Sequence, residues 1–199
     1  MALVAATVAA STFILLSGWL EPVAVVGGFI TDRFRGLEIP PELGFAVPAW
    51  LTPLSATLIH GGPGHLLLNT VMLGYCGAGV ERVIGARALL LLYVIGAYAA
   101  AAGEALLTGG AMIGASGAIS AVLATYALLY GRNRARSFGP VPGSVVHIVW
   151  LAAAWIGLQV LVGLVGIGGG RIAIGAHMGG FLAGLALARP LLLWRWRGA

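Results

Sequence analysis

Four polar side chains within the apolar stretches of this sequence could do chemistry together: Ser116, His177, His65 and Asn69. A serine hydroxyl and a histidine imidazole make a nucleophile and its general base when they lie within hydrogen-bond reach. Each residue alone also has a plainer interpretation, because a serine among small residues usually packs helices and a lone histidine can pair with a carbonyl. Their positions relative to one another therefore have to decide between chemistry and packing.

Depth along the apolar stretches favours chemistry. At ~1.5 Å per helical residue, Ser116, His177 and His65 lie roughly 24, 27 and 25 Å from the arginine that ends each stretch. Asn69 is four residues after His65, so it shares that helix face one turn deeper. Three separate helices that bring polar groups to one level are hard to explain by packing, and ionisable groups inside a membrane are costly unless they serve a function.

The composition predicts that these stretches cross a membrane. The chain has 199 residues, of which 60% are hydrophobic and 9% charged, with a mean hydropathy of +1.00. So little polar surface cannot cover a soluble domain of this size. Charge and Gly/Pro clusters divide the apolar residues into six predicted spans, the first of which we interpret as a retained span: 2–20, 64–80, 88–107, 113–131, 145–166 and 172–194.

The chain has no lysine, so all of its permanently charged basic residues are arginines, and the net charge is +5. They set the topology of the chain and do not indicate nucleic-acid binding, because none cluster with aromatic residues on a soluble face. Seven follow the even-numbered spans: Arg82, Arg87, Arg132, Arg134, Arg136, Arg195 and Arg197. Three lie on the opposite side, offset by acidic residues: Arg33, Arg35 and Arg171. The positive-inside rule then places both termini in the cytoplasm.

One domain over residues 1–199 is predicted, with a core at about 45–190. The long first connection, residues 21–63, is predicted to be a loop partly embedded in the membrane. Its apolar piece, 22–30, is too short to span.

A stripe of small residues, Ala176, Gly180 and Gly184, recurs every four residues beside His177. Such a stripe lets a neighbouring helix approach at backbone distance. If that neighbour is the span 113–131, which is also rich in small residues, Ser116 and His177 can share a proton.

Four segments carry a family resemblance. They are HGGPGHLLLN (60–69), GVERVIGAR (79–87), GASGA (114–118) and AHMGGFLAG (176–184). Together, and in this order, they resemble the signature segments of the rhomboid intramembrane serine proteases. The resemblance implies an all-α membrane protein, a bundle of six transmembrane helices with a long first loop.

For the site, the resemblance implies that Ser116 is the nucleophile and His177 the general base and acid of a dyad. His65 and Asn69 would line an oxyanion hole with the backbone amide of Ser116, and Gly180 and Gly184 would pack helices. Neither a cofactor nor a metal is expected, since no HExxH or phosphate-binding loop appears.

Two positions depart from the family pattern. Leu51 follows Trp50 where the family often has an arginine that anchors the first loop. Ser120 stands where the family frequently has an aromatic residue that stacks on the histidine, which leaves the positioning of His177 open. His60 could gate water, but an interfacial role is the preferred interpretation.

The leading prediction is an endopeptidase that cleaves transmembrane segments of other proteins near the outer face. A catalytically silent relative that binds membrane helices is one alternative, and a small transporter is another. The expected partners are transmembrane substrates and the lipid bilayer, with no nucleic acid. The sequence does not indicate the oligomeric state. The compact core suggests, by analogy only, a multi-pass protein of a bacterial inner membrane.

Overall fold

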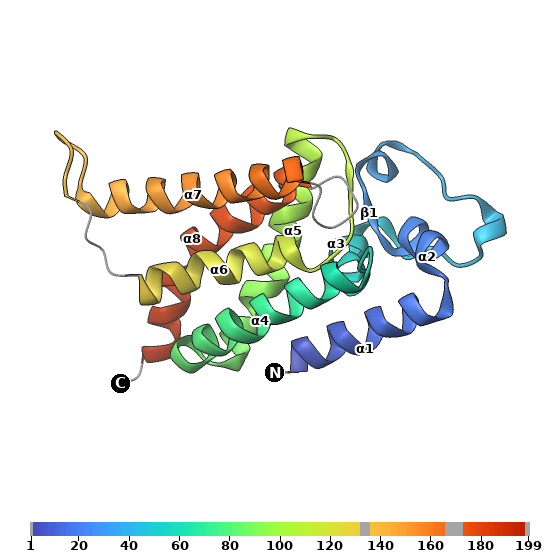
Figure 1. Ribbon diagram of the computed structural model, residues 1–199, viewed down its shortest axis with the longest axis horizontal. Helices are drawn as coiled ribbons and strands as arrows, with labels where there is room; N and C mark the ends of the chain where they lie inside the picture. The colour runs from blue at the N-terminus through green and yellow to red at the C-terminus, as the bar shows by residue number, and fades with distance from the viewer. Residues whose placement is uncertain (1, 132–135, 166–172, 198–199) are drawn as a thin grey trace.

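Six long helices form the body of the protein (Figure 1). The computed structural model describes residues 2–131, 136–165 and 173–197, with the backbone alone for 158–165. The long helices of this part are α1 (Ala2–Ser17), α4 (Pro63–Ile84), α5 (Ala86–Leu107), α6 (Ser116–Tyr130), α7 (Gly143–Val165) and α8 (Ile174–Trp196). Each coincides with one predicted apolar span, so the mostly helical fold is confirmed.

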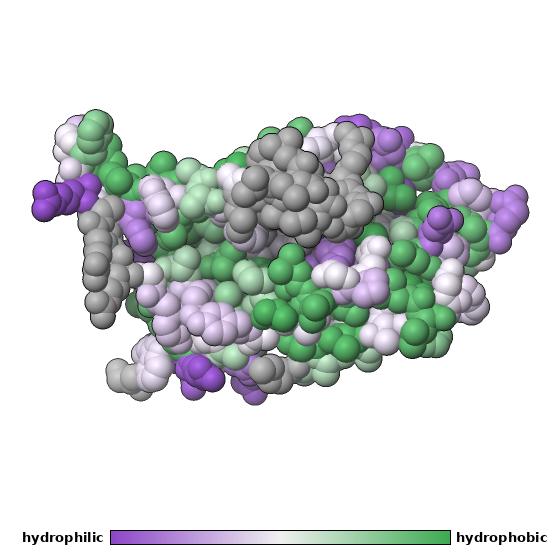
Figure 2. All heavy atoms as spheres, in the orientation of Figure 1, coloured by the Kyte–Doolittle hydropathy of each residue, from purple (hydrophilic) through white to green (hydrophobic). Residues whose placement is uncertain are grey.

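Two helices in the described ranges are both long and apolar enough to cross a bilayer by themselves. They are α5 and α8, with mean hydropathies of 1.8 and 1.3. The helices α1 and α6 are apolar but shorter, at 16 and 15 residues. Figure 2 shows hydrophobic side chains over the middle of the molecule, with hydrophilic ones gathered toward its two ends.

Helices α5, α6 and α8 pack most closely, and α4 lies against α6. Small residues allow this approach: a Cβ on Gly180 would overlap the Gly117 carbonyl oxygen, and one on Gly184 would overlap that of Ala121. The stripe beside His177 therefore faces α6, as a small-residue helix contact requires.

The first loop is more structured than the sequence indicates. The piece at 22–30 falls mostly in a short helix, α2 (Leu20–Gly27), followed by a strand, β1 (Phe29–Ile30). This strand pairs antiparallel with β2 (Ala111–Met112), which directly precedes the segment that carries Ser116. The purely helical prediction misses this pair, because a two-residue strand has no readable sequence period.

Short helical turns complete the loop. They are η1 (Thr31–Arg35), η2 (Pro41–Leu43), η3 (Ala49–Leu51), α3 (Thr52–Ser55) and η4 (Ala56–Leu58). Arg33 donates hydrogen bonds to the Val47 carbonyl at 2.7 Å and to the Val26 carbonyl at 3.5 Å. An arginine therefore does anchor this loop, from a position ahead of the one that the family pattern suggests.

Both chain ends lie at the helix ends away from the first loop (Figure 1). This agrees with the same-side termini that the arginine count requires. Arg132, Arg134 and Arg171, which entered that count, lie outside the described residues, and the orientation in the membrane stays a prediction.

Candidate active site

Ser116 and His177 come together between α6 and α8. The serine Oγ lies 2.7 Å from the histidine Nε2, although 61 positions separate them in the chain. The helix of the predicted span 113–131 begins three residues later than that span. Gly114, with φ +103°, makes a turn that only glycine adopts freely, and α6 begins at Ser116 itself.

That position gives the hydroxyl a polar backbone environment. The first N–H groups of a helix have no partner within the helix and point toward its N-terminal end. Ser116 is therefore next to unpaired donors and the positive end of the helix dipole, which favour negative charge that develops nearby.

His177 lies in the first turns of α8 and is 8% exposed. Its ring centroid is 6.3 Å from that of Trp155, on α7, and the same tryptophan stacks on Phe181. Ser120, in contrast, turns its hydroxyl back to donate to the Ser116 carbonyl at 2.8 Å. The aromatic neighbour of His177 thus comes from α7 and not from position 120, which the sequence alone gave no means of finding.

His65 lies against the turn that precedes Ser116. A Cβ on Gly114 would be 2.7 Å from the His65 Nε2 atom, so only glycine leaves room for this ring. The Gly61 N–H donates to His65 Nδ1 at 3.3 Å. A neutral imidazole that accepts at Nδ1 carries its proton on Nε2, so Nε2–H is a donor beside Gly114.

Asn69 is buried one turn further along α4, at 5% exposure. Its side-chain Nδ2 donates to the His65 carbonyl at 2.8 Å. The amide carries two hydrogens, and this bond uses one of them. The structure brings His65 to the serine turn but holds Asn69 on its own helix.

His60 is a site residue that the sequence analysis underrated. Its preferred interpretation, an interfacial residue, is wrong, because the side chain is fully buried, at 0% exposure. The Ser11 hydroxyl donates to the Leu58 carbonyl at 2.7 Å, which leaves His60 Nδ1–H to donate to Ser11 Oγ at 2.8 Å. His60 Nε2 then accepts from the Ala115 N–H at 3.3 Å.

This chain of bonds joins α1 to the residue before Ser116. It requires a neutral His60, since a second proton on Nε2 would face the Ala115 N–H. His60 lies in the connection ahead of α4, and its burial, with a smaller effect of the neighbouring His65, lowers its pKa to about 4. The ring is therefore a fixed acceptor at neutral pH, and its signal in the sequence was only a histidine five residues before another.

The His60→Gln variant is expected to change the pH dependence of stability. In the wild type, the unfolded chain binds a proton at His60 below about pH 6.5, whereas the folded protein binds it only near pH 4. The free energy of unfolding should therefore fall as the pH drops through this interval, by on the order of 2 kcal/mol from this residue. Thermal unfolding in detergent from pH 4 to 7 measures it; an equally steep profile in His60→Gln would contradict the assignment.

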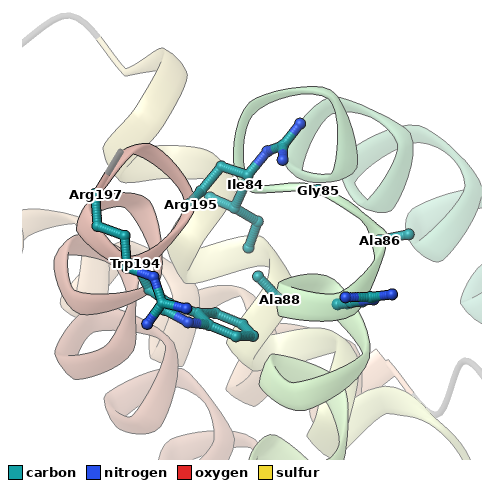
Figure 3. A pocket seen from close by; sticks show the side chains of 8 residues that line it. Ile84, Gly85, Ala86, Ala88, Trp194, Arg195 and Arg197 are labelled. Atoms are coloured by element: carbon teal, nitrogen blue, oxygen red, sulfur yellow. The ribbon is translucent and has the colours of Figure 1, made fainter. Parts of the chain in front are cut away.

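One cavity lies at the other end of the bundle (Figure 3). Its volume is about 560 Å³, and Arg87, Trp194, Arg195 and Arg197 are among its lining residues. It cannot be the polar entrance to Ser116, so a wet outer pocket stays a prediction. Within the described residues, no group of three His, Cys, Asp or Glu side chains could hold a metal ion.

Comparison with known proteins points to one family throughout. The rhomboid domain family profile matches residues 48–194. RHOMBOID-like protein 4 of Arabidopsis thaliana is 33% identical over 141 residues, which cover 70% of this chain and 34% of the relative. Rhomboid protease GlpG of Pectobacterium atrosepticum is 29% identical over 174 residues, 83% of this chain and 59% of the relative. Rhomboid protease GlpG of Klebsiella pneumoniae is 29% identical over 179 residues, which cover 85% of this chain and 61% of the relative. The chain thus spans between a third and three fifths of the length of these relatives.

Proposed function

This chain belongs to the rhomboid family of integral membrane proteins, and we propose that it is a serine endopeptidase that cleaves transmembrane segments of other proteins near the outer face. The observation that carries the proposal is the 2.7 Å distance between Ser116 Oγ and His177 Nε2. That distance is the one a nucleophile and its general base require.

In the proposed reaction, Ser116 Oγ attacks the carbonyl carbon of a substrate peptide bond while His177 Nε2 takes the hydroxyl proton. The C–N bond then breaks, and His177 returns the proton to the leaving amine, which forms an acyl-serine. Water attacks this ester, again with His177 as the base, and frees Ser116. Trp155 and the close contact of α8 with α6 support the orientation of the imidazole in this proposal.

Negative charge on the carbonyl oxygen needs donors that are in place before the reaction. The backbone N–H of Ser116, at the start of α6, is one candidate, and His65 Nε2–H beside Gly114 is a second. Asn69 is the third, through its remaining amide hydrogen, and it would have to turn toward the site when substrate binds. One such donor typically contributes about 3 kcal/mol of transition-state stabilisation.

The proposal includes a six-span bundle in a bacterial inner membrane with both termini in the cytoplasm. Helix lengths of 22 or 23 residues for α4, α5, α7 and α8 support four of the spans. The shorter α1 and α6 would need the bilayer to thin locally or the flanking loops to enter it. A helical substrate must unwind before Ser116 can reach its backbone, so helix-weakening residues are expected near the cut.

A fluorophosphonate probe tests this function directly. The purified protein should be labelled on Ser116, and Ser116→Ala should abolish the label, because the probe traps an activated serine hydroxyl. Ser120→Ala is the matched control, since it removes a hydroxyl one turn further along the same helix and should leave labelling unchanged. A folded wild type that is not labelled, or a label that persists in Ser116→Ala, would overturn the proposal.

A further inference from the structure

A carboxylate is buried near the outer end of α5. Glu104 is 3% exposed and lies outside the four segments that carry the family resemblance. An ionisable group within a membrane helix is costly to bury, so its retention calls for a specific partner.

The partner of Glu104 is the helix that carries His177. Its Oε2 accepts a hydrogen bond from the backbone N–H of Ala176 at 3.1 Å. Ala176 is the residue before His177 and the third residue of α8, where backbone N–H groups lack partners within the helix. The carboxylate therefore satisfies one of these donors, at the turn from which the imidazole extends.

Two glycines enclose the carboxylate. A Cβ on Gly110 would be 2.7 Å from Oε1, and a Cβ on Gly175 would be 3.1 Å from Oε2. Gly110 belongs to the connection between α5 and α6, and its carbonyl accepts from the backbone N–H of Thr31 in the first loop. Glu104 thus lies where the serine-bearing connection, α5 and α8 meet.

The backbone of Glu104 is itself held in place. Its carbonyl oxygen accepts from the N–H groups of Thr108 and Gly109 at 3.0 and 2.8 Å, and from the Thr108 hydroxyl at 2.9 Å. These bonds close the end of α5, so the carboxylate projects from a fixed point. A fixed acceptor at this point can help to define the height and rotation of α8 relative to α5.

We propose that Glu104 is a positioning residue, which holds the first turn of α8 so that His177 Nε2 stays within reach of Ser116 Oγ. It acts through the Ala176 N–H as a hydrogen-bond acceptor and does not touch the reacting atoms. This inference rests on the proposed function of Ser116 and His177. A displacement of about 1 Å between reacting groups can cost on the order of 100-fold in rate.

Two variants separate the acceptor from the charge. Glu104→Gln keeps an oxygen acceptor at the same chain length, whereas Glu104→Leu has a similar size and no acceptor. Glu104→Leu is expected to lower kcat and the rate of fluorophosphonate labelling by about 30-fold, with KM within about 3-fold of the wild type. Glu104→Gln should restore both rates to within about 3-fold of the wild type.

Thr125→Val controls for a merely structural effect. Thr125 Oγ1 donates to the Gly184 carbonyl of α8 at 3.1 Å, so this variant also removes a buried hydrogen bond to α8, two turns deeper. It should lower the Tm about as much as Glu104→Leu and leave kcat unchanged. If kcat falls in both variants in proportion to Tm, or if Glu104→Gln is as slow as Glu104→Leu, the positioning role is overturned.

Hydrogen exchange gives a readout that does not need activity. The amides of the first turns of α8, residues 174–180, should exchange faster in Glu104→Leu than in the wild type or Glu104→Gln. Unchanged exchange would overturn the inference even in an active protein. A wild type that resists the fluorophosphonate but shows this exchange pattern would instead defeat the proposed function and leave the anchoring of α8 supported.

Discussion

The His177→Ala variant is expected to lose at least about 10⁴-fold in kcat while the protein remains folded. Without an imidazole 2.7 Å from its Oγ, Ser116 has no group to take its proton and none to protonate the leaving amine. Turnover of a single-pass membrane substrate in proteoliposomes measures the loss. KM should change little, because the ring is needed in the transition state more than in the bound complex.

The control for this variant is His147→Ala. His147 lies on α7, also within an apolar helix, and its removal should leave turnover within about 3-fold of the wild type. Thermal unfolding of both variants separates loss of chemistry from loss of fold. Turnover above about 1% of the wild type in folded His177→Ala would show that another group is the base.

The sequence predicts the helices well because each needs only local information. Apolar runs of about 20 residues that end at charged or Gly/Pro clusters can hardly be anything other than helices in a chain of this hydropathy. Counting residues from the inner arginines also placed Ser116, His177 and His65 at one depth, and two of these side chains are in hydrogen-bond contact. Depth is readable because a helix has a constant rise per residue.

Features that depend on backbone bends were not readable in this way. The start of α6 at Ser116 follows from the turn at Gly114, and GASG in a chain with 32 glycines does not reveal which glycine turns. The pairing of β1 with β2 joins segments of two residues, far too short for a sequence period. Both features lie just before Ser116, so the part of the fold that is hardest to predict from the sequence positions the proposed nucleophile.

Two long-range contacts of buried polar side chains were equally hard to predict. Ser11 and His60 are 49 positions apart, and Glu104 and Ala176 are 72 apart. The sequence marks each of these groups as polar in an apolar setting, which signals that it has a partner but not which one. In both cases the contact leads to the residue directly before Ser116 or His177, namely Ala115 or Ala176. A buried polar residue outside the recognised motifs therefore pointed to the candidate site.

Replacement of Gly180 or Gly184 by alanine is expected to have the second largest effect. The added methyl group would overlap a carbonyl oxygen of α6, at Gly117 or Ala121, and backbone atoms cannot give way as a flexible side chain can. Overpacking of this kind typically costs about 1–3 kcal/mol, which corresponds to a fall in Tm of roughly 3–10 °C for a chain of this size. Because α8 carries His177, separation from α6 should also lower kcat, by on the order of 100-fold for Gly180→Ala.

Gly74→Ala provides the matched control. Gly74 is on α4, and a Cβ there would meet no atom within 4 Å, so the alanine gains helix propensity without a clash. Its free energy of unfolding should rise by up to about 1 kcal/mol, so its Tm should equal or exceed that of the wild type, with unchanged kcat. Opposite results for one chemical substitution on two helices would show that contact with α6, and not glycine content, makes the α8 stripe necessary. If Gly180→Ala were as stable and active as Gly74→Ala, α8 could not lie as close to α6 as the Ser116–His177 contact demands.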